Sequence, residues 1–296
     1  MRPELIEATE LMRTDDPERI DSALRLLQNT VYSFSMKVCG HREDAEDTMQ
    51  FVLQQSLPYL QTIEDPQALA VWLYKVTRNH CGLMRRKSKF APERMLTLDE
   101  LKPSEGDLEH LLESRELSPE ASVLQGERDE QLQQAILRIP PKYRLVLVLH
   151  DMEELDTAEI ARITGLTVGT VRIRLHRARL FVRKELTMPT SVVAKPKRRR
   201  EAGRLAGRQA ATECHEVFAQ LSEYLDGRLD DVSCDDLKRH IEECRPCVSF
   251  IRDLEGTIAR CRSLKVPCSE QTTSALRRML TEEYLRLLQK ASAKVC

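Results

Sequence analysis

The chain has 296 residues, enough for two or three small domains, and a formal net charge of −1. Such a small net charge excludes any argument from overall charge to an acidic or basic partner, so only local clusters are informative. No run of about 18 apolar residues predicts a membrane-spanning helix, and Met1–Glu7 lacks the apolar stretch of a signal peptide, so we expect a cytoplasmic protein.

The composition predicts helices throughout. Leu, Ala, Glu, Arg and Gln dominate, aromatic residues make up 4%, and long runs of β-branched residues do not occur. We predict an all-α fold with two helical domains on a linker and a small helical metal-binding domain. The expected segments are a first domain at 1–90, an acidic linker at 91–126, a helix-turn-helix domain at 127–188, a basic tether at 189–211, a cysteine-rich domain at 212–262 and a C-terminal helix at 263–296.

Three helices are expected in the first domain. Asp16 and Pro17 predict a helix start, because a carboxylate caps the first turn and proline fits inside it. Cys39-Gly40 predicts its end. A second helix is expected from about Arg42 to Tyr59, and a third from about Gln67 to Arg86.

The second helix has two distinct faces. Ala45, Met49 and Val52, with Leu60 beyond them, are expected to be buried. The other face carries Phe51 among the polar residues Asp44, Asp47 and Gln54. An exposed aromatic ring among carboxylates favours a protein-binding surface, although an ordinary amphipathic helix remains the alternative.

The third helix combines aromatic and basic residues. The aromatic residues Trp72 and Tyr74 are followed by Lys75, Arg78 and Asn79. The segment ends in the basic pair Arg85-Arg86. Stacking of bases on aromatic rings and pairing of phosphates with cations are what binding to an opened DNA strand requires. The alternative for Trp72 is a place in the core.

The second domain follows a linker with nine acidic and three basic residues. Its first helix is expected to bury Leu132, Ala135, Ile136 and Ile139, and Tyr143–His150 forms a second, apolar helix after Pro140-Pro141.

A helix-turn-helix is predicted next. Ala161 is small enough for two helices to cross, Gly165 allows the positive φ of a tight turn, and Val171 anchors the second helix. The second helix carries Arg172, Arg174, His176, Arg177 and Arg179, as expected of a helix that lies in a DNA groove. An ordinary helix pair with a solvated basic face is the alternative.

The order of these motifs along the chain resembles that of a known family. Asp44-Ala-Glu-Asp-x-x-Gln50 and Trp72-Leu-x-x-x-x-Arg78-Asn79 precede an acidic linker and a helix-turn-helix that ends in Gly169-Thr-Val-x-x-Arg174-Leu-x-Arg-Ala-Arg179. This order is similar to that of extracytoplasmic-function sigma factors over roughly residues 20–187. The resemblance implies two partners, core RNA polymerase and promoter DNA, and no small-molecule substrate.

The resemblance also implies roles for individual residues. The polymerase would bind Asp44, Asp47, Gln50, Phe51 and Gln54. The loop at residues 60–66 would read a flipped base, and the melted strand would contact Trp72, Lys75, Arg78, Asn79, Arg85 and Arg86. The more distant promoter element would contact Thr167, Thr170, Arg172, Arg174, His176 and Arg177.

The nine cysteines divide into two groups. Cys39 and Cys81 are interpreted as core or incidental residues. The other seven follow residue 213, and among them Cys214, Cys244 and Cys247, with His240, form a set of three sulfurs and one nitrogen that suits a structural Zn²⁺ ion. A helical hairpin with free thiols is the alternative.

The segment from Cys214 to Cys247 resembles the zinc-binding anti-sigma domain. The hypothesis that follows is that this tail regulates the sigma factor in cis. Its remaining thiols, Cys234, Cys261, Cys268 and Cys296, would suit a second, labile metal ion or a redox change, and incidental cysteines are the alternative.

Other functions were weighed against this one. A DNA-binding regulator that does not engage polymerase would use only the helix-turn-helix. A zinc enzyme is disfavoured because four protein ligands leave no open position for water, and no other group suits bond-making chemistry. A stand-alone thiol sensor would not need the first 190 residues.

Overall fold

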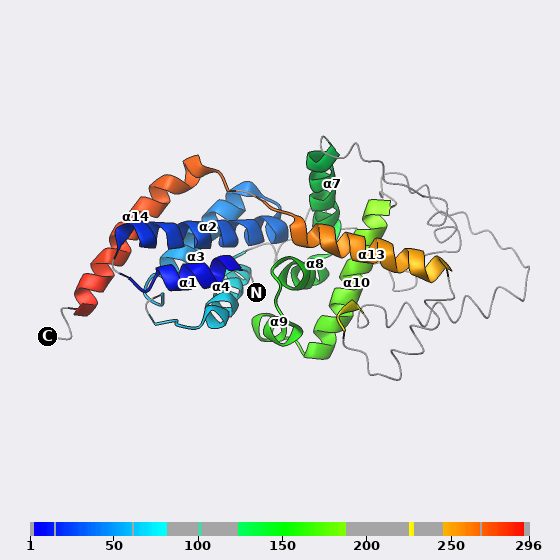
Figure 1. Cartoon of the computed structure of the whole chain (residues 1–296), viewed down its shortest axis with the longest axis horizontal. Helices are drawn as coiled ribbons and strands as arrows, with labels where there is room; N and C mark the ends of the chain where they lie inside the picture. The colour runs from blue at the N-terminus through cyan, green and yellow to red at the C-terminus, as the bar shows by residue number, and fades with distance from the viewer. Residues whose placement is uncertain are drawn as a thin grey trace, which may run out of the picture. The chain divides into compact units, whose positions relative to one another are not determined.

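The computed structural model describes residues 3–14, 16–60, 62–81, 101, 124–187, 225–227, 245–266 and 268–292. Every regular element in these ranges is a helix, which confirms the all-α prediction (Figure 1). The chain forms two compact units, one of residues 1–91, 140–171 and 264–296, the other of residues 92–139 and 172–263.

The first unit is built around a bundle of four helices (Figure 1). These are α1 (Pro3–Leu11), α2 (Pro17–Cys39), α3 (Arg42–Ser56) and α4 (Pro66–His80). The remaining elements of this unit are α8 (Pro141–Leu147), the π-helical turn η2 (Val148–Met152), α9 (Thr157–Thr164) and α14 (Glu270–Ser292).

Local sequence signals set the ends of α2 and α4. Asp16 caps α2 by accepting a hydrogen bond from the Glu18 amide, and Gly40 ends the helix with a φ of 76°. Asp65 caps α4 by accepting from the amides of Gln67 and Ala68. The predicted start and end of the first long helix are therefore confirmed.

The core of the bundle follows the predicted apolar stripes. Along α3, Ala45, Met49 and Val52 are buried, and Leu60 is buried in the loop that follows. These burials confirm the predicted inner face of α3 and leave its opposite face for other contacts.

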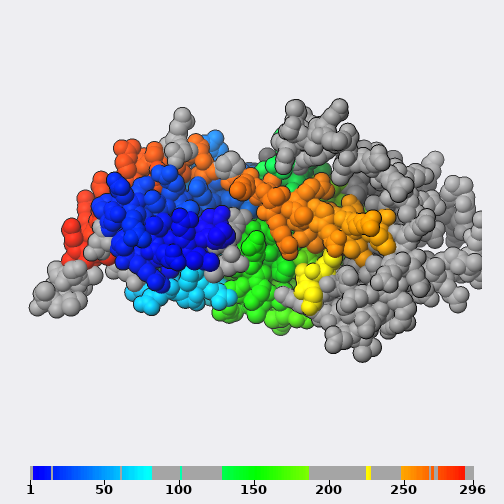
Figure 2. Space-filling view, viewed as in Figure 1, coloured from blue at the N-terminus to red at the C-terminus, as the bar shows by residue number. Residues whose placement is uncertain are grey.

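The C-terminal helix α14 packs on α2 in the same unit. The Arg277 guanidinium pairs with Asp21 at 2.9 Å, Leu280 is fully buried, and the Tyr284 hydroxyl donates to the Met12 carbonyl at 3.4 Å. Atoms of α14 and of the first helices form one continuous surface (Figure 2). The final helix is thus part of the first unit's structure.

The second unit contains α7 (Leu124–Arg138), most of α10 (Val168–Thr187) and α13 (Arg245–Ser263). The predicted stripe of Leu132, Ala135, Ile136 and Ile139 is buried. Arg138 of α7 pairs with Glu185 of α10 at 3.2 Å.

The two compact units do not follow one another along the sequence, because each is made of separate segments. Residues 140–171, which the sequence assigns to the second helical domain, cluster with residues 1–91. The linker prediction for 91–126 and the tether prediction for 189–211 fall outside the described residues, apart from Leu101. The domain boundaries therefore stay predictions.

Candidate nucleic-acid interface

The outer face of α3 is open to solvent. Asp47, Gln50 and Gln54 are exposed, Asp44 is half-buried, and Phe51 keeps 39% of its surface exposed. An apolar ring held at the surface among polar groups has the character of a protein-binding surface. The expected exposure of Phe51 is confirmed, and the binding of polymerase to this face stays a prediction.

Phe51 also connects α3 to α4. Its ring stacks on that of His80, with centroids 4.0 Å apart and planes inclined by 15°. The His80 Nδ1 atom also lies 3.3 Å from the hydroxyl of Thr48, which belongs to α3 as well. The two candidate surfaces are therefore adjacent and share this contact.

The outer face of α4 presents the expected mixture of groups. Lys75 and Asn79 are exposed, and Trp72 is half-buried, with its ring centroid 5.5 Å from that of the exposed Tyr59. Trp72 is therefore neither wholly core nor freely exposed. Arg85 and Arg86 lie outside the described residues.

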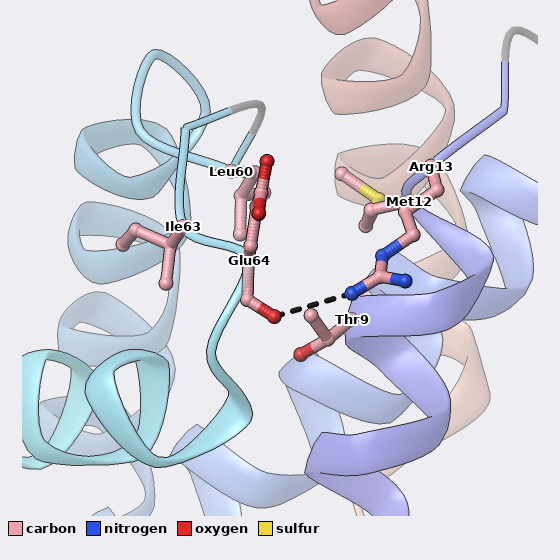
Figure 3. A pocket seen from close by; sticks show the side chains of 6 residues that line it. All are labelled: Thr9, Met12, Arg13, Leu60, Ile63 and Glu64. Carbon is pink, nitrogen blue, oxygen red and sulfur yellow. Dashed lines mark hydrogen bonds between the residues drawn. The ribbon is translucent and has the colours of Figure 1, made fainter.

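A pocket of about 380 Å³ opens between the end of α1 and the loop that joins α3 to α4 (Figure 3). Thr9, Met12 and Arg13 line one side, and the Arg13 guanidinium donates to the Glu64 carbonyl at 3.3 Å. Leu60, Ile63 and Glu64 line the other side. This loop is the one in which recognition of a flipped base is expected from the resemblance, and that role stays a prediction.

The inner part of α4 packs against α9. The Arg78 guanidinium donates to the Ile163 carbonyl, and the Gln67 amide donates to the Glu159 carboxylate at 2.6 Å. Arg78, one of the predicted DNA contacts, is therefore half-buried and occupied by another helix.

A buried polar cluster joins α2, α4 and the residue that follows η2. The Lys37 ammonium lies 3.1 Å from one oxygen of Glu153, and the Tyr74 hydroxyl donates to the other oxygen at 2.6 Å. Sequence reasoning missed this cluster, because Lys37 and Glu153 are 116 residues apart.

The helix-turn-helix has the predicted geometry. Gly165 has a φ of 71°, its amide donates to the Ala161 carbonyl at 2.8 Å, and Val171 is fully buried. Asp156 and Glu159 form a capping box at the start of α9. The Thr167 hydroxyl caps α10 by accepting from the Thr170 amide at 3.3 Å.

Only part of α10 is accessible. Thr167 and Arg172 are exposed, whereas Thr170, Arg174 and Arg177 are half-buried. His176, which was expected to contact DNA, is 8% exposed and does not present its ring to a groove in this structure. Ile173, which sequence reasoning missed, is 60% exposed and places an apolar side chain between Arg172 and Arg174 in the sequence.

The later turns of α10 are covered by carboxylates from the C-terminal third of the chain. Arg179 pairs with Asp226 at 2.8 Å, and Arg183 pairs with Asp253 at 2.7 Å. The Arg183 guanidinium also lies over the Phe250 ring of α13, 4.2 Å from its centroid. Arg172, Arg179 and Arg183 share one face of the helix, so the tail covers the continuation of the exposed basic surface.

Comparison with known proteins shows to which protein family the chain belongs. A family model described as Sigma-70, region 4 matches residues 129–182, and a zinc-finger family model matches residues 214–247. The chain is 28% identical over 176 residues to the ECF RNA polymerase sigma factor SigW of Bacillus subtilis, covering 59% of this chain and 92% of that protein. It is 27% identical over 184 residues to the RNA polymerase sigma-H factor of Pseudomonas aeruginosa, covering 61% and 92%. The chain is an extracytoplasmic-function sigma factor.

The sigma factor carries an anti-sigma-like zinc-finger region at its C-terminal side. Of the four expected ligands, Cys214, His240 and Cys244 lie outside the described residues, and Cys247 belongs to the first turn of α13. Among the described residues no group of three or more metal-binding side chains occurs. The donor set itself, three thiolates and an imidazole, fits a tetrahedral Zn²⁺ ion.

The interpretation of Cys39 and Cys81 needs a correction. Both are buried, as expected of core residues, but a disulfide joins them, with their Cα atoms 6.9 Å apart. They are therefore a pair rather than incidental residues of the sigma factor. The ends of α2 and α4 come together only in the folded bundle, so the sequence gives no local signal for the pairing.

Two broader properties of the sigma factor follow at the family level. Its relatives are sigma factors, which as a class are not catalytic enzymes. No described helix is both long and apolar enough to cross a membrane.

Proposed function

We propose that this sigma factor directs core RNA polymerase to specific promoters, opens the DNA there, and is regulated in cis by its cysteine-rich tail (residues 212–262). Core polymerase binds the outer face of α3, through Asp44, Asp47, Gln50, Phe51 and Gln54. The opened strand binds along α4, and the first turns of α10 read the upstream element.

The exposed face of α3 beside α4 is the observation that carries this proposal. Asp47, Gln50 and Gln54 surround an exposed Phe51, and the Phe51–His80 stacking joins this face to the helix with Trp72 and Asn79. A factor that melts DNA only when bound to polymerase benefits from such adjacency, because docking on one face orients the other.

The pocket beside α4 supports the melting step. Opening DNA costs roughly 1.4 kcal/mol per base-pair step, so contacts made only to the opened strand are needed to offset it. A base flipped into the hollow between Thr9 and Ile63, with neighbouring bases on Trp72, provides contacts of that kind.

The ion pairs on α10 support regulation by the tail. Asp226 and Asp253 hold Arg179 and Arg183 in the way that DNA phosphates would. Release of the tail uncovers both arginines and extends the basic surface that begins at Arg172. The zinc ion proposed at Cys214, His240, Cys244 and Cys247 would hold the segments on either side of Asp226 together and so maintain this cover.

Transcription on a pooled promoter library tests the sigma function. Core polymerase with the full chain is expected to give a discrete set of transcripts that core alone does not give. Phe51→Ala should abolish polymerase binding and transcripts together, whereas Trp72→Ala should retain polymerase binding and lose open complexes in permanganate footprints. Duplex binding without any association with polymerase would support a simple DNA-binding regulator instead.

A paired substitution tests regulation by the tail. Asp226→Asn with Asp253→Asn should strengthen duplex binding about tenfold at 0.1 M salt. The slope of log K against log salt concentration should steepen by an amount that corresponds to about two additional phosphate contacts. Unchanged binding and unchanged transcript yield would exclude the proposed cover. Arg172→Gln, on the exposed turn, should weaken binding in both backgrounds.

A further inference from the structure

Ile173 is the most exposed of the large apolar side chains among the described residues. It keeps 60% of its surface exposed on α10, whereas the other exposed apolar residues, which are Ile6, Phe51, Tyr59 and Met279, keep 38% to 50%. A single exposed apolar residue is common on a protein surface. This one stands out because it lies on the basic helix of a helix-turn-helix, where the groups around it are suited to DNA.

The buried side of α10 fixes the direction in which Ile173 points. Val171 and Leu175 are both buried. Each lies two residues from Ile173, and two residues correspond to about 200° around a helix. Ile173 therefore projects from the side of α10 that is opposite to the buried one.

Arginines lie on both sides of Ile173. Arg172 is exposed and lies about 100° around the helix in one direction, and the half-buried Arg177 lies about 40° in the other. Phosphates line both walls of the major groove. A helix that lies in this groove with its arginines toward the walls therefore brings the side chain between them to the base edges.

The chemistry of the base edges leaves one partner for such a side chain. An isoleucine neither donates nor accepts a hydrogen bond, so a donor or acceptor of a base would lose its water against it without compensation. Thymine alone presents an apolar group in the major groove, its C5-methyl group. Contact between this methyl group and Ile173 removes apolar surface of both from water.

We propose that Ile173 determines part of the promoter specificity, by reading a thymine of the upstream element through contact with its C5-methyl group. This inference rests on the proposed sigma function. It separates two roles on α10, because arginine contacts to phosphates supply affinity without sequence information, whereas a base contact supplies specificity.

The proposed contact does not require release of the tail. Asp226 and Asp253 pair with Arg179 and Arg183, further along α10, and Ile173 is exposed in the same structure. The thymine contact therefore belongs to the part of the helix that stays accessible while the tail is in place.

Replacement of thymine by deoxyuridine tests the proposal, because it removes only the methyl group. Core polymerase with the full chain first selects duplexes from a randomised pool, and each thymine of the recovered upstream element is then replaced singly. The wild type should bind one of these uracil duplexes about three- to fivefold more weakly than its thymine parent, as expected for one buried methyl group. Ile173→Ala should bind the same two duplexes equally, within about 1.5-fold.

Two variants serve as controls. Ile6→Ala makes the same change at an exposed isoleucine of α1 and should keep the wild-type preference for thymine. Arg172→Gln should weaken binding to the thymine and uracil duplexes alike, since a phosphate contact carries no sequence information. Ile173→Ala should fold normally, because the side chain is exposed and alanine favours a helix more than isoleucine does.

Two results would overturn the proposal. One is that every effect of a thymine methyl group persists in Ile173→Ala. The other is that Ile173→Ala weakens the association with core polymerase while the ratio of thymine to uracil binding stays as in the wild type, because Ile173 would then contact protein.

Failure of the sigma function has a different outcome. A wild-type chain that does not bind core polymerase would contradict that function, and the same thymine and uracil duplexes with the full chain alone then decide on Ile173. Promoter selection by the wild type together with an unchanged preference in Ile173→Ala would reject the thymine contact alone.

Discussion

At the scale of single residues, the turn of the helix-turn-helix depends on one backbone conformation. Gly165 has a φ of 71°, and a Cβ atom placed there would meet no atom within 4 Å. A side chain at position 165 would therefore destabilise the protein only through the unfavourable backbone conformation, and not through a steric clash.

Gly165→Ala should lower the free energy of unfolding by about 1–2 kcal/mol, because left-handed backbone is unfavourable for residues with a Cβ atom. Gly169→Ala is the matched control, since this glycine lies in α10 with equally open surroundings. Alanine at 169 should raise stability by up to about 1 kcal/mol. Urea denaturation followed by circular dichroism measures both, and equal effects would contradict the argument.

The thiol of Cys268 allows a prediction of pH dependence. Burial, with a smaller effect from the Glu46 carboxylate, raises the pKa of Cys268 to about 11. A raised pKa keeps the thiol protonated at neutral pH, which makes Cys268 a poor redox or metal sensor.

Alkylation of Cys268 should therefore speed up by about tenfold per pH unit between pH 7 and 10, as measured by mass spectrometry of its peptide. The same cysteine in urea provides the control and should reach its plateau near its ordinary pKa. A plateau near pH 9 in the folded chain would contradict the raised pKa of Cys268.

At the scale of elements, the start of α9 is set by its capping box. Asp156 accepts hydrogen bonds from the amides of Ala158 and Glu159, both at 2.7 Å. Asp156→Ala should lower the free energy of unfolding by about 1 kcal/mol, whereas Asp156→Asn should change it by only a few tenths, because asparagine also caps well. Thermal unfolding of the three proteins measures this, and identical midpoints would refute the role of the cap.

The helices also show what sequence can predict. The ends of α2, the buried face of α3 and the Gly165 turn were all predicted, because each depends on residues a few positions apart. The Lys37–Glu153 pair and the Arg179–Asp226 pair were not, because their partners come together only through tertiary packing. One signal was present: Lys37 follows Phe34 by one turn within an apolar stretch, where a lysine needs a buried partner.

Within the candidate site, the sequence identified residue types better than their availability. Phe51, Lys75 and Asn79 are exposed as expected. Arg78 is half-buried and donates to the Ile163 carbonyl of α9, and His176 is 8% exposed. Coverage of this kind cannot be inferred from spacing along one helix.

At the scale of the whole molecule, the tail should depend on zinc. Cys244→Ser removes one of four proposed ligands, and a structural site with three ligands binds zinc much more weakly. Bound zinc should fall from about one ion per chain to nearly none in elemental analysis, and duplex binding should rise as Arg179 and Arg183 are released. A full zinc content in the variant would contradict the ligand assignment.

The central claim is that the outer face of α3 binds core RNA polymerase. Co-elution of the purified full-length chain with core polymerase tests it most directly, with Asp47→Lys as the disrupting variant and Arg42→Gln, on the opposite side of α3, as the control. The wild type and the control should elute with polymerase as a one-to-one complex, whereas Asp47→Lys should elute alone. A wild-type chain that elutes separately from polymerase, while its fold is intact, would contradict the account.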